Sequence, residues 1–229
     1  GLTAGAGIAH TRWATHGVPS ERNAHPHVSG DLAVVHKGII ENYMEINARL
    51  AGLGYAFASE TDTEVIAHLI EHKLKSQADL IAAVRAACAE LVGAYAIAVL
   101  SEKEPQRVVV ARHGAPLLLG LGEDGHYAAS DTAALLQVTR TLIYLEDGDI
   151  AEIIAFNQPL NAAQRMIVTN YLSAKYNIAL AAGNDMYTMD NAGLNFDFDV
   201  AGIGRASSAG ESHVEAQGPG IVRVLNAST

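Results

Sequence analysis

Three segments in the first half of the chain repeat apolar residues every three or four positions, the spacing of a helix that buries one face. These segments cover residues 41–53, 61–74 and 78–91. The second begins at Thr61 and has Glu64 three residues later, the form of a capping box that starts a helix. We therefore expect three consecutive amphipathic helices that pack their apolar sides against a common core.

Shorter apolar runs, separated by turn residues, lie on both sides of this helical block and predict strands. One run covers residues 32–35, and a short run that we expect to form a buried strand, Gly7 to His10, opens the chain. The runs after the helices are residues 94–100, 107–112, 117–121, 126–130 and 142–145. Helices inserted among antiparallel strands predict an α+β sandwich, with the sheets inside and the helices outside.

The last third of the chain has a different character. Residues 150–156 are typical of one more strand, and residues 161–175 of a capped amphipathic helix. Beyond them the chain is rich in Gly, Asn, Asp and Ser, with a weak strand pattern at residues 221–225. We expect two parts, residues 1–153 and an unrelated tail of residues 154–229.

Composition and charge exclude several classes of partner. Of the 229 residues, 49% are hydrophobic, enough for a sizeable core, and the formal net charge of −10 argues against nucleic acid or an anionic membrane as partner. No apolar run is long enough to span a bilayer. A single cysteine excludes an intramolecular disulfide and favours a reducing, cytoplasmic compartment. Because the chain starts with Gly in mid-pattern, we expect it to be a fragment.

A polar loop near the start of the chain carries the richest chemistry. Residues 7–27 hold two arginines, four histidines and a tryptophan. Arg12 has a planar, permanently charged guanidinium group whose paired N–H donors suit a carboxylate. Trp13 can cover a site with its apolar face, and Thr15 and His16 add short polar contacts. The alternative is a solvated surface loop, but the density of these residues favours a binding loop.

Four motifs in order along the chain, TRWATHG, NAHPH, VVHKGIIENY and SETDTEVIAHL, carry a resemblance to a known family. They resemble the glutaminase domain of the glucosamine-6-phosphate synthases, the isomerising glutamine–fructose-6-phosphate aminotransferases. Later matches follow at residues 91–95 and 147–153. The resemblance implies the four-layer αββα sandwich of N-terminal nucleophile hydrolases, here lacking its N-terminal strands and followed by a strand–helix unit and an irregular tail.

The same resemblance implies hydrolysis of glutamine to glutamate and ammonia. In this family the nucleophile is the thiol of an N-terminal cysteine, whose own α-amino group acts as the base. The chain holds only Cys88, which lies on the apolar stripe of a predicted helix and has no matching motif around it. We interpret Cys88 as a core residue. The isolated chain is therefore expected to be inactive.

Residue by residue, the motifs imply the glutamine-binding half of such a site. Arg12 would grip the α-carboxylate of glutamine, and Asp62 would accept from its α-ammonium group, unless Asp62 serves only the first turn of its helix. His25 matches a histidine near the site, and a purely structural role is an equal alternative for it. The residues that match positions lining or closing the pocket are Trp13, Thr15 and His16.

Lys37 departs from the family pattern. The family has Asn at this position, and its amide together with the backbone N–H of Gly38 forms the oxyanion hole. Losing one such donor costs on the order of 10²–10³ in rate. Lysine is also a hydrogen-bond donor, but its long flexible aliphatic chain does not hold the ammonium group in a fixed position. Lys37 therefore weakens the catalytic interpretation independently of the missing thiol.

The resemblance also implies partners beyond this chain. In the full-length family a sugar isomerase domain receives the ammonia and aminates fructose 6-phosphate, and the enzyme is a homodimer. We expect no cofactor and no metal. Residues 148–178 also resemble the last strand and closing helix of laminin-G-like sandwiches, with a junction near residues 148–153. Two alternatives stay open: a protein that binds glutamine without cleaving it, and a laminin-G-like binding module.

Overall fold

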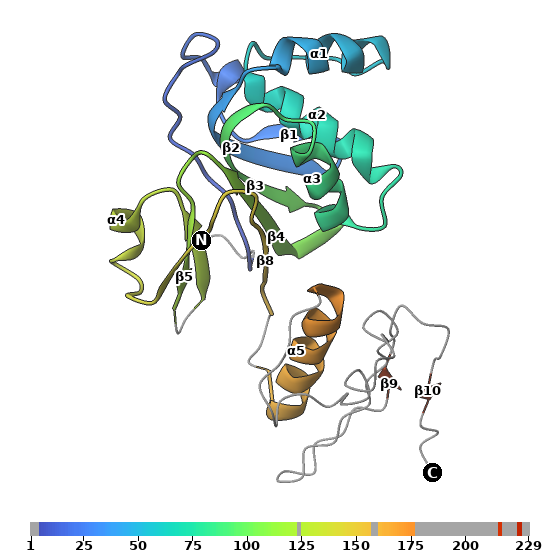
Figure 1. Cartoon of the computed structure of the whole chain (residues 1–229), viewed down its shortest axis with the longest axis vertical. Helices are drawn as coiled ribbons and strands as arrows, with labels where there is room; N and C mark the ends of the chain where they lie inside the picture. The colour runs from blue at the N-terminus through green and yellow to red at the C-terminus, as the bar shows by residue number, and fades with distance from the viewer. Residues whose placement is uncertain (1–4, 123–124, 157–159, 177–214, 217–223, 226–229) are drawn as a thin grey trace. The chain divides into compact units, whose positions relative to one another are not determined.

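The computed structural model describes residues 5–122, 125–156, 160–176, 215–216 and 224–225 (Figure 1). The chain divides into two compact units, Gly1–Ala155 and Phe156–Thr229. The candidate site residues all lie in the first unit. Within the described residues, no helix is both long enough and apolar enough to cross a membrane.

An antiparallel sheet of five strands, in the order β1-β2-β3-β4-β8, forms the centre of the first unit. Its strands are β1 (His27–Ser29), β2 (Leu32–Ile40), β3 (Gly93–Ser101), β4 (Glu104–His113) and β8 (Ile150–Ile154). β2 and β3 pair along their whole length, from Leu32 opposite Ser101 to Ile40 opposite Gly93. The sequence predicted a shorter strand that ended at Val35, and this boundary was wrong because the pairing with β3 continues for five more residues.

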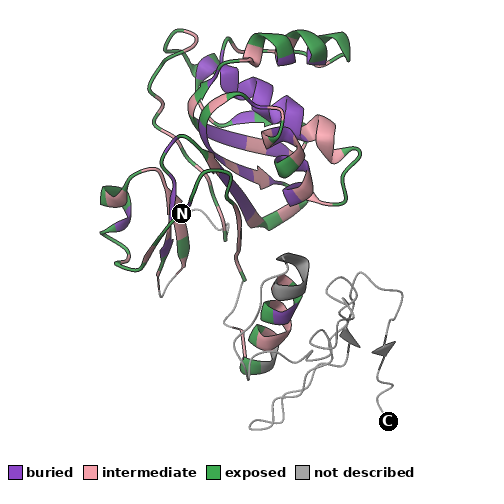
Figure 2. Cartoon of the chain, in the orientation of Figure 1, coloured by how far each residue is buried: buried purple, intermediate pink, exposed green. Residues whose placement is uncertain are grey.

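Three helices cover one face of this sheet: α1 (Tyr43–Gly52), α2 (Asp62–Leu74) and α3 (Leu80–Cys88). All three were expected from the apolar spacing. Figure 2 shows that burial is concentrated on α2 and on the strands beneath it, and every residue from Thr61 to Ile70 is buried. Helix α2 packs against β1 and β2 on one side and α3 on another. The site described below is built at the N-terminus of this central helix.

The start of α2 confirms half of the predicted capping box. Thr61 is the N-cap, and its hydroxyl accepts a hydrogen bond from the Glu64 backbone N–H at 3.3 Å. The Glu64 carboxylate, however, does not return to Thr61. It accepts from the backbone N–H groups of Ala58 and Ser59 at 2.7 and 2.6 Å. Glu64 therefore ties the preceding loop to the helix, which fixes the position at which Asp62 enters α2.

A second, three-stranded sheet lies on the other side of the five-stranded sheet. Its order is β6-β5-β7, with β5 (Leu118–Leu121), β6 (His126–Ala129) and β7 (Leu142–Tyr144). The short helix α4 (Thr132–Leu135) packs on β6. Where β5 meets the segment around α4, a Cβ added to Gly120 would lie 2.8 Å from the Thr139 side chain and 3.3 Å from that of Leu135. The order of layers is therefore helix, sheet, sheet, helix.

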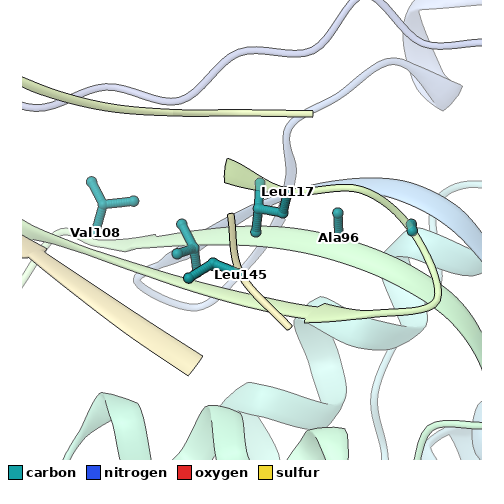
Figure 3. Close-up of a cluster of buried hydrophobic side chains, with 6 residues drawn as sticks. Ala96, Val108, Leu117 and Leu145 are labelled. Atoms are coloured by element: carbon teal, nitrogen blue, oxygen red, sulfur yellow. The ribbon is translucent and has the colours of Figure 1, made fainter. Parts of the chain in front are cut away.

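The apolar core between the two sheets joins side chains from both (Figure 3). Its buried members are Ala96, Val108, Val110, Ala115, Leu117 and Leu145. Ala96 and Val108 come from the five-stranded sheet, whereas Leu117 and Leu145 flank strands of the smaller sheet. Burial of these side chains, at about 25 cal/mol per Å² of apolar surface, holds the two sheets together.

The strand expected at Gly7 to His10 is not formed. These residues have no regular secondary structure, and they alternate between exposed and half-buried. The side chain of Ile8 does pack against the core between the sheets, as its apolar character requires. No described strand pairs with this segment, so the apolar alternation produces a packed but extended coil instead of a strand.

In the second unit, the structure describes helix α5 (Ala162–Tyr176) and two short paired strands, β9 (Glu215–Ala216) and β10 (Val224–Leu225). The helix was expected at residues 161–175. Its first turn is closed by a reciprocal pair: Asn161 Oδ1 accepts from the Gln164 N–H at 2.8 Å, and Gln164 Oε1 accepts from the Asn161 N–H at 2.9 Å. The Gly- and Asp-rich stretch expected after it lies outside the described residues, apart from the two short strands.

Candidate active site

Asp62 is the centre of the candidate site. It is the first residue of α2 and only 4% exposed, although an isolated carboxylate is costly to bury. Its Oδ2 atom accepts a hydrogen bond from the backbone N–H of Ile40 at 2.9 Å. The Nδ1 atoms of His16 and His36 lie 3.8 and 4.0 Å from the same oxygen. Asp62 therefore bonds to β2 instead of capping its own helix, and its carboxylate faces two imidazoles.

Histidines surround this carboxylate. The His10 and His25 rings meet edge to face with centroids 4.4 Å apart, and the His25 and His27 rings are 5.2 Å apart. The hydroxyl of Thr63 joins two rings, at 3.0 Å from His25 Nε2 and 3.1 Å from His36 Nδ1. Segments far apart in the sequence, from the N-terminal loop, β1, β2 and α2, thus converge at one place.

Burial keeps these imidazoles neutral. Burial, and after it the neighbouring His10 and His27, lower the pKa of His25 to about 3. Burial also lowers the pKa of His36 to about 4, although the Asp62 carboxylate acts in the opposite direction. Burial is also the main cause that lowers the pKa of His27. At neutral pH the cluster is therefore polar and uncharged beside one negative carboxylate.

Arg12 is occupied by its own loop. Its guanidinium donates to the backbone carbonyls of Gly17 at 2.7 Å and Val18 at 3.3 Å, and also to that of His16. Its backbone has a positive φ of 46°, and its N–H donates to His10 Nδ1 at 2.9 Å. Among the described residues, Arg12 forms no ion pair with a carboxylate. In this structure it shapes the loop that carries His16 beside Asp62.

The expected lid residues lie at the surface. Trp13 is 90% exposed, and Thr15 is exposed as well. His16 is half-buried, with its ring 4.9 Å from that of Tyr43. The structure thus places His16 beside Asp62 and His25 beside Thr63, and leaves Trp13 and Thr15 facing solvent.

The two residues at the expected oxyanion position lie on β2. Lys37 is exposed and pairs with Ala96 of β3. Gly38 has a φ of 141°, and a Cβ at this position would lie 1.9 Å from the carbonyl oxygen of Ala94. Only glycine fits where the two strands approach so closely. Gly38 therefore has a structural role whether or not its N–H takes part in catalysis.

The structure places Cys88 at the last position of α3, not among the histidines. Burial raises the pKa of its thiol, and the hydroxyl of Tyr95 donates to the Cys88 carbonyl at 3.5 Å. A thiol with a raised pKa forms little thiolate and is a poor nucleophile. The described residues also contain no group of three or more His, Cys, Asp or Glu side chains arranged to hold a metal ion.

Two functional candidates escaped the sequence analysis. His36 and Thr63 both lie in motifs that carried the resemblance, VVHKG and SETDTE, but neither was singled out. His36 and Thr63 are 27 residues apart in the sequence, so their direct hydrogen bond could not be predicted from it. The only signal was their position next to Lys37 and Asp62, which were singled out.

Known proteins share the sequence of this unit. Residues 10–137 match the model of the glutamine amidotransferase domain family. The glutamine–fructose-6-phosphate aminotransferase (isomerising) of Pseudomonas putida is 62% identical over 148 residues, which are 64% of this chain and 24% of that protein. The protein of the same name from Pseudomonas aeruginosa is 61% identical over 148 residues, with the same shares. The chain thus spans about a quarter of the length of these relatives.

A solved structure supports the fold. The glutamine phosphoribosylpyrophosphate amidotransferase of B. subtilis, solved with ADP and GMP, matches with a TM-score of 0.50 and 22% identity, over 72% of this chain and 42% of that one. At this identity the likeness concerns the fold alone, and it confirms the α+β sandwich. With a family model that covers more than half of its length, the chain belongs to the glutamine amidotransferase domain family.

Proposed function

We propose that this chain supplies the glutamine-binding site of a glutamine–fructose-6-phosphate aminotransferase. The observation that carries the proposal is the buried Asp62 carboxylate at the N-terminus of α2, facing His16 and His36. The neutral imidazole of His36 does not neutralise a buried carboxylate, so Asp62 is suited to accept an ammonium group. The identity of about 60% to enzymes named for glutamine supports glutamine as the source of that group.

In this proposal each residue has a distinct role toward glutamine. Asp62 accepts from the α-ammonium group, with His16 and His25 beside it. The Arg12 guanidinium leaves one or more of its loop carbonyls and binds the α-carboxylate through paired N–H donors. Trp13 and Thr15 close over the bound amino acid. Lys37 and the N–H of Gly38 face the carbonyl oxygen of the side-chain amide.

Calorimetric titration with glutamine tests this proposal. We expect the 229-residue chain to bind glutamine at millimolar or lower concentration, and Asp62→Asn and Arg12→Ala each to weaken binding at least about tenfold, because each removes a charge-assisted contact. Glu45→Gln on the exposed side of α1 is the matched control and should bind like the parent. A folded parent chain that shows no binding of glutamine contradicts the proposal.

We further propose that the chain cannot hydrolyse glutamine by itself. Its single cysteine lies on α3 with a raised thiol pKa, away from the residues that converge on Asp62. Glutamate release by the purified chain is therefore expected to stay at background, and Cys88→Ser should leave it there. Release well above background that disappears in Cys88→Ser would show that Cys88 is a nucleophile after all.

The wider activity belongs to a longer protein. The relatives are about four times the length of the matched region, which leaves room for a sugar isomerase domain that binds fructose 6-phosphate and receives ammonia. A homodimer and a reducing, cytoplasmic location belong to the same proposal, the latter supported by the single cysteine. The assignment of residues 1–153 to the glutaminase domain, and of 154–229 to a laminin-G-like tail, stays a prediction.

A further inference from the structure

The side chain of Thr63 joins two histidines that come from different parts of the chain. Thr63 is the second residue of α2, is 1% exposed, and lies next to Asp62. Its hydroxyl oxygen is 3.0 Å from His25 Nε2 and 3.1 Å from His36 Nδ1. A threonine near the start of a helix can bond to its own backbone, but this hydroxyl bonds to two imidazoles instead. The arrangement constrains the protons of both rings.

A hydroxyl carries one proton, so it can donate to one ring and must accept from the other. The Asp62 carboxylate decides between the two directions, because its Oδ2 atom lies 4.0 Å from His36 Nδ1. A negative carboxylate attracts an N–H group and repels a nitrogen lone pair. His36 Nδ1–H therefore donates to Thr63, and the Thr63 hydroxyl donates to the Nε2 lone pair of His25.

This direction gives both rings the same tautomer. With Nε2 of His25 as an acceptor, its proton is on Nδ1, and the proton of His36 is on Nδ1 as well. A free imidazole prefers to carry its proton on Nε2, so neither ring is in its default form. The other nitrogens, His25 Nδ1 and His36 Nε2, are buried and have no hydrogen-bond partner among the described residues. Among the described residues, the side-chain hydrogen bonds of these two rings are those to Thr63, and the backbone of Ala94 also acts on His36.

We propose that Thr63 is a positioning residue that fixes the tautomers of His25 and His36, so that an N–H group of His36 faces the Asp62 carboxylate. Together with the Ile40 N–H, this group holds Oδ2 in one orientation, ready to accept an ammonium group. The effect on glutamine binding rests on the function proposed above. The tautomers themselves do not depend on it.

The protonation of the ring nitrogens can be read directly. Long-range ¹H–¹⁵N correlation spectra of the ¹⁵N-labelled 229-residue chain at neutral pH distinguish protonated from unprotonated ring nitrogens. We expect Nδ1–H for both His25 and His36 in the parent chain. In Thr63→Val the His25 ring should shift to Nε2–H, whereas the Asp62 carboxylate still favours Nδ1–H on His36. In Thr63→Ser, which keeps the hydroxyl, His25 should return to Nδ1–H. An unprotonated Nδ1 on His36 in the parent chain overturns the proposal without any variant.

His68 is an internal control in the same spectra. It lies on α2, but its Nδ1 hydrogen-bonds to Ser29 at 2.6 Å, so its signals should not change in either variant. A Thr63→Val chain in which His25 keeps its tautomer, with His68 unchanged, overturns the proposal. If all three rings change together, the variant has lost its fold; the parent and Thr63→Ser spectra then decide.

Glutamine affinity separates positioning from a purely structural role. Thr63→Val should weaken binding about five- to tenfold, because it removes the hydroxyl that bonds to both His25 and His36, and Thr63→Ser, which keeps that hydroxyl, should restore binding. Switched tautomers with unchanged affinity would overturn the positioning role. A parent chain that does not bind glutamine at all contradicts the proposed function instead, while the tautomers still test the assignment of Thr63.

Discussion

Replacing Gly38 with alanine should destabilise the chain by about 3–5 kcal/mol, enough to unfold most domains of this size. The added Cβ would lie 1.9 Å from the Ala94 carbonyl oxygen and 2.9 Å from the Tyr95 Cα atom, both in the backbone of β3. The φ of 141° adds strain that any side chain would suffer. Relief requires β2 and β3 to separate at the centre of the sheet. Urea unfolding followed by circular dichroism measures the loss.

Gly52→Ala is the matched control for this prediction. Gly52 ends α1, and a Cβ added there would meet no atom within 4 Å, so alanine should leave stability unchanged or raise it by about 0.5–1 kcal/mol. A Gly38→Ala chain with the stability of the parent would show that β3 can move away at little cost. The comparison matters for function, because lost glutamine binding in any Gly38 variant reflects lost folding before it reflects a lost contact of the Gly38 N–H with the ligand.

The parts of the fold that the sequence predicted correctly are those with a local physical cause. Helix α2 begins at a threonine cap followed by a glutamate, and its apolar face repeats with the helical period. The prediction for Gly7 to His10 was wrong because a strand needs a partner strand, and an apolar alternation alone does not supply one. The continuation of β2 through Ile40 was missed for the converse reason, since β3 supplies its partner from more than fifty residues away.

The candidate site divides in the same way. Asp62 and His16 were named from their motifs, and the structure places them 3.8 Å apart. The connection through Thr63 could not be predicted, because it joins β2, α2 and the loop before β1 in space. The hydrogen bonds from Arg12 to the backbone carbonyls of its loop could not be predicted either, since every residue type has a backbone carbonyl.

Acid should destabilise this chain well before its carboxylates are protonated. The pKa values of His25 and His36 lie near 3 and 4 in the folded chain, against an ordinary value of 6.5 when unfolded. Below pH 6.5 the two histidines therefore bind protons in the unfolded chain but not in the folded chain. The free energy of unfolding falls as the pH falls toward the folded pKa values. Each histidine contributes at most about 1.4 kcal/mol per pH unit, less for His25 because it is half-exposed. We expect a loss of about 3–5 kcal/mol between about pH 7 and about pH 4.5.

Urea unfolding at a series of pH values measures this loss. The window above pH 4.5 isolates the histidines, because Glu64, whose pKa is lowered by hydrogen bonds from Ala58 and Ser59, contributes only below the ordinary carboxyl value of 4.5. His36→Gln keeps a hydrogen-bonding side chain but cannot titrate, so it should flatten the pH dependence, whereas the exposed His126→Gln on β6 should not. If stability is level from about pH 7 to about pH 5, or if His36→Gln leaves the slope unchanged, the histidines do not stay neutral in the folded chain, and the uncharged surroundings inferred for Asp62 are wrong.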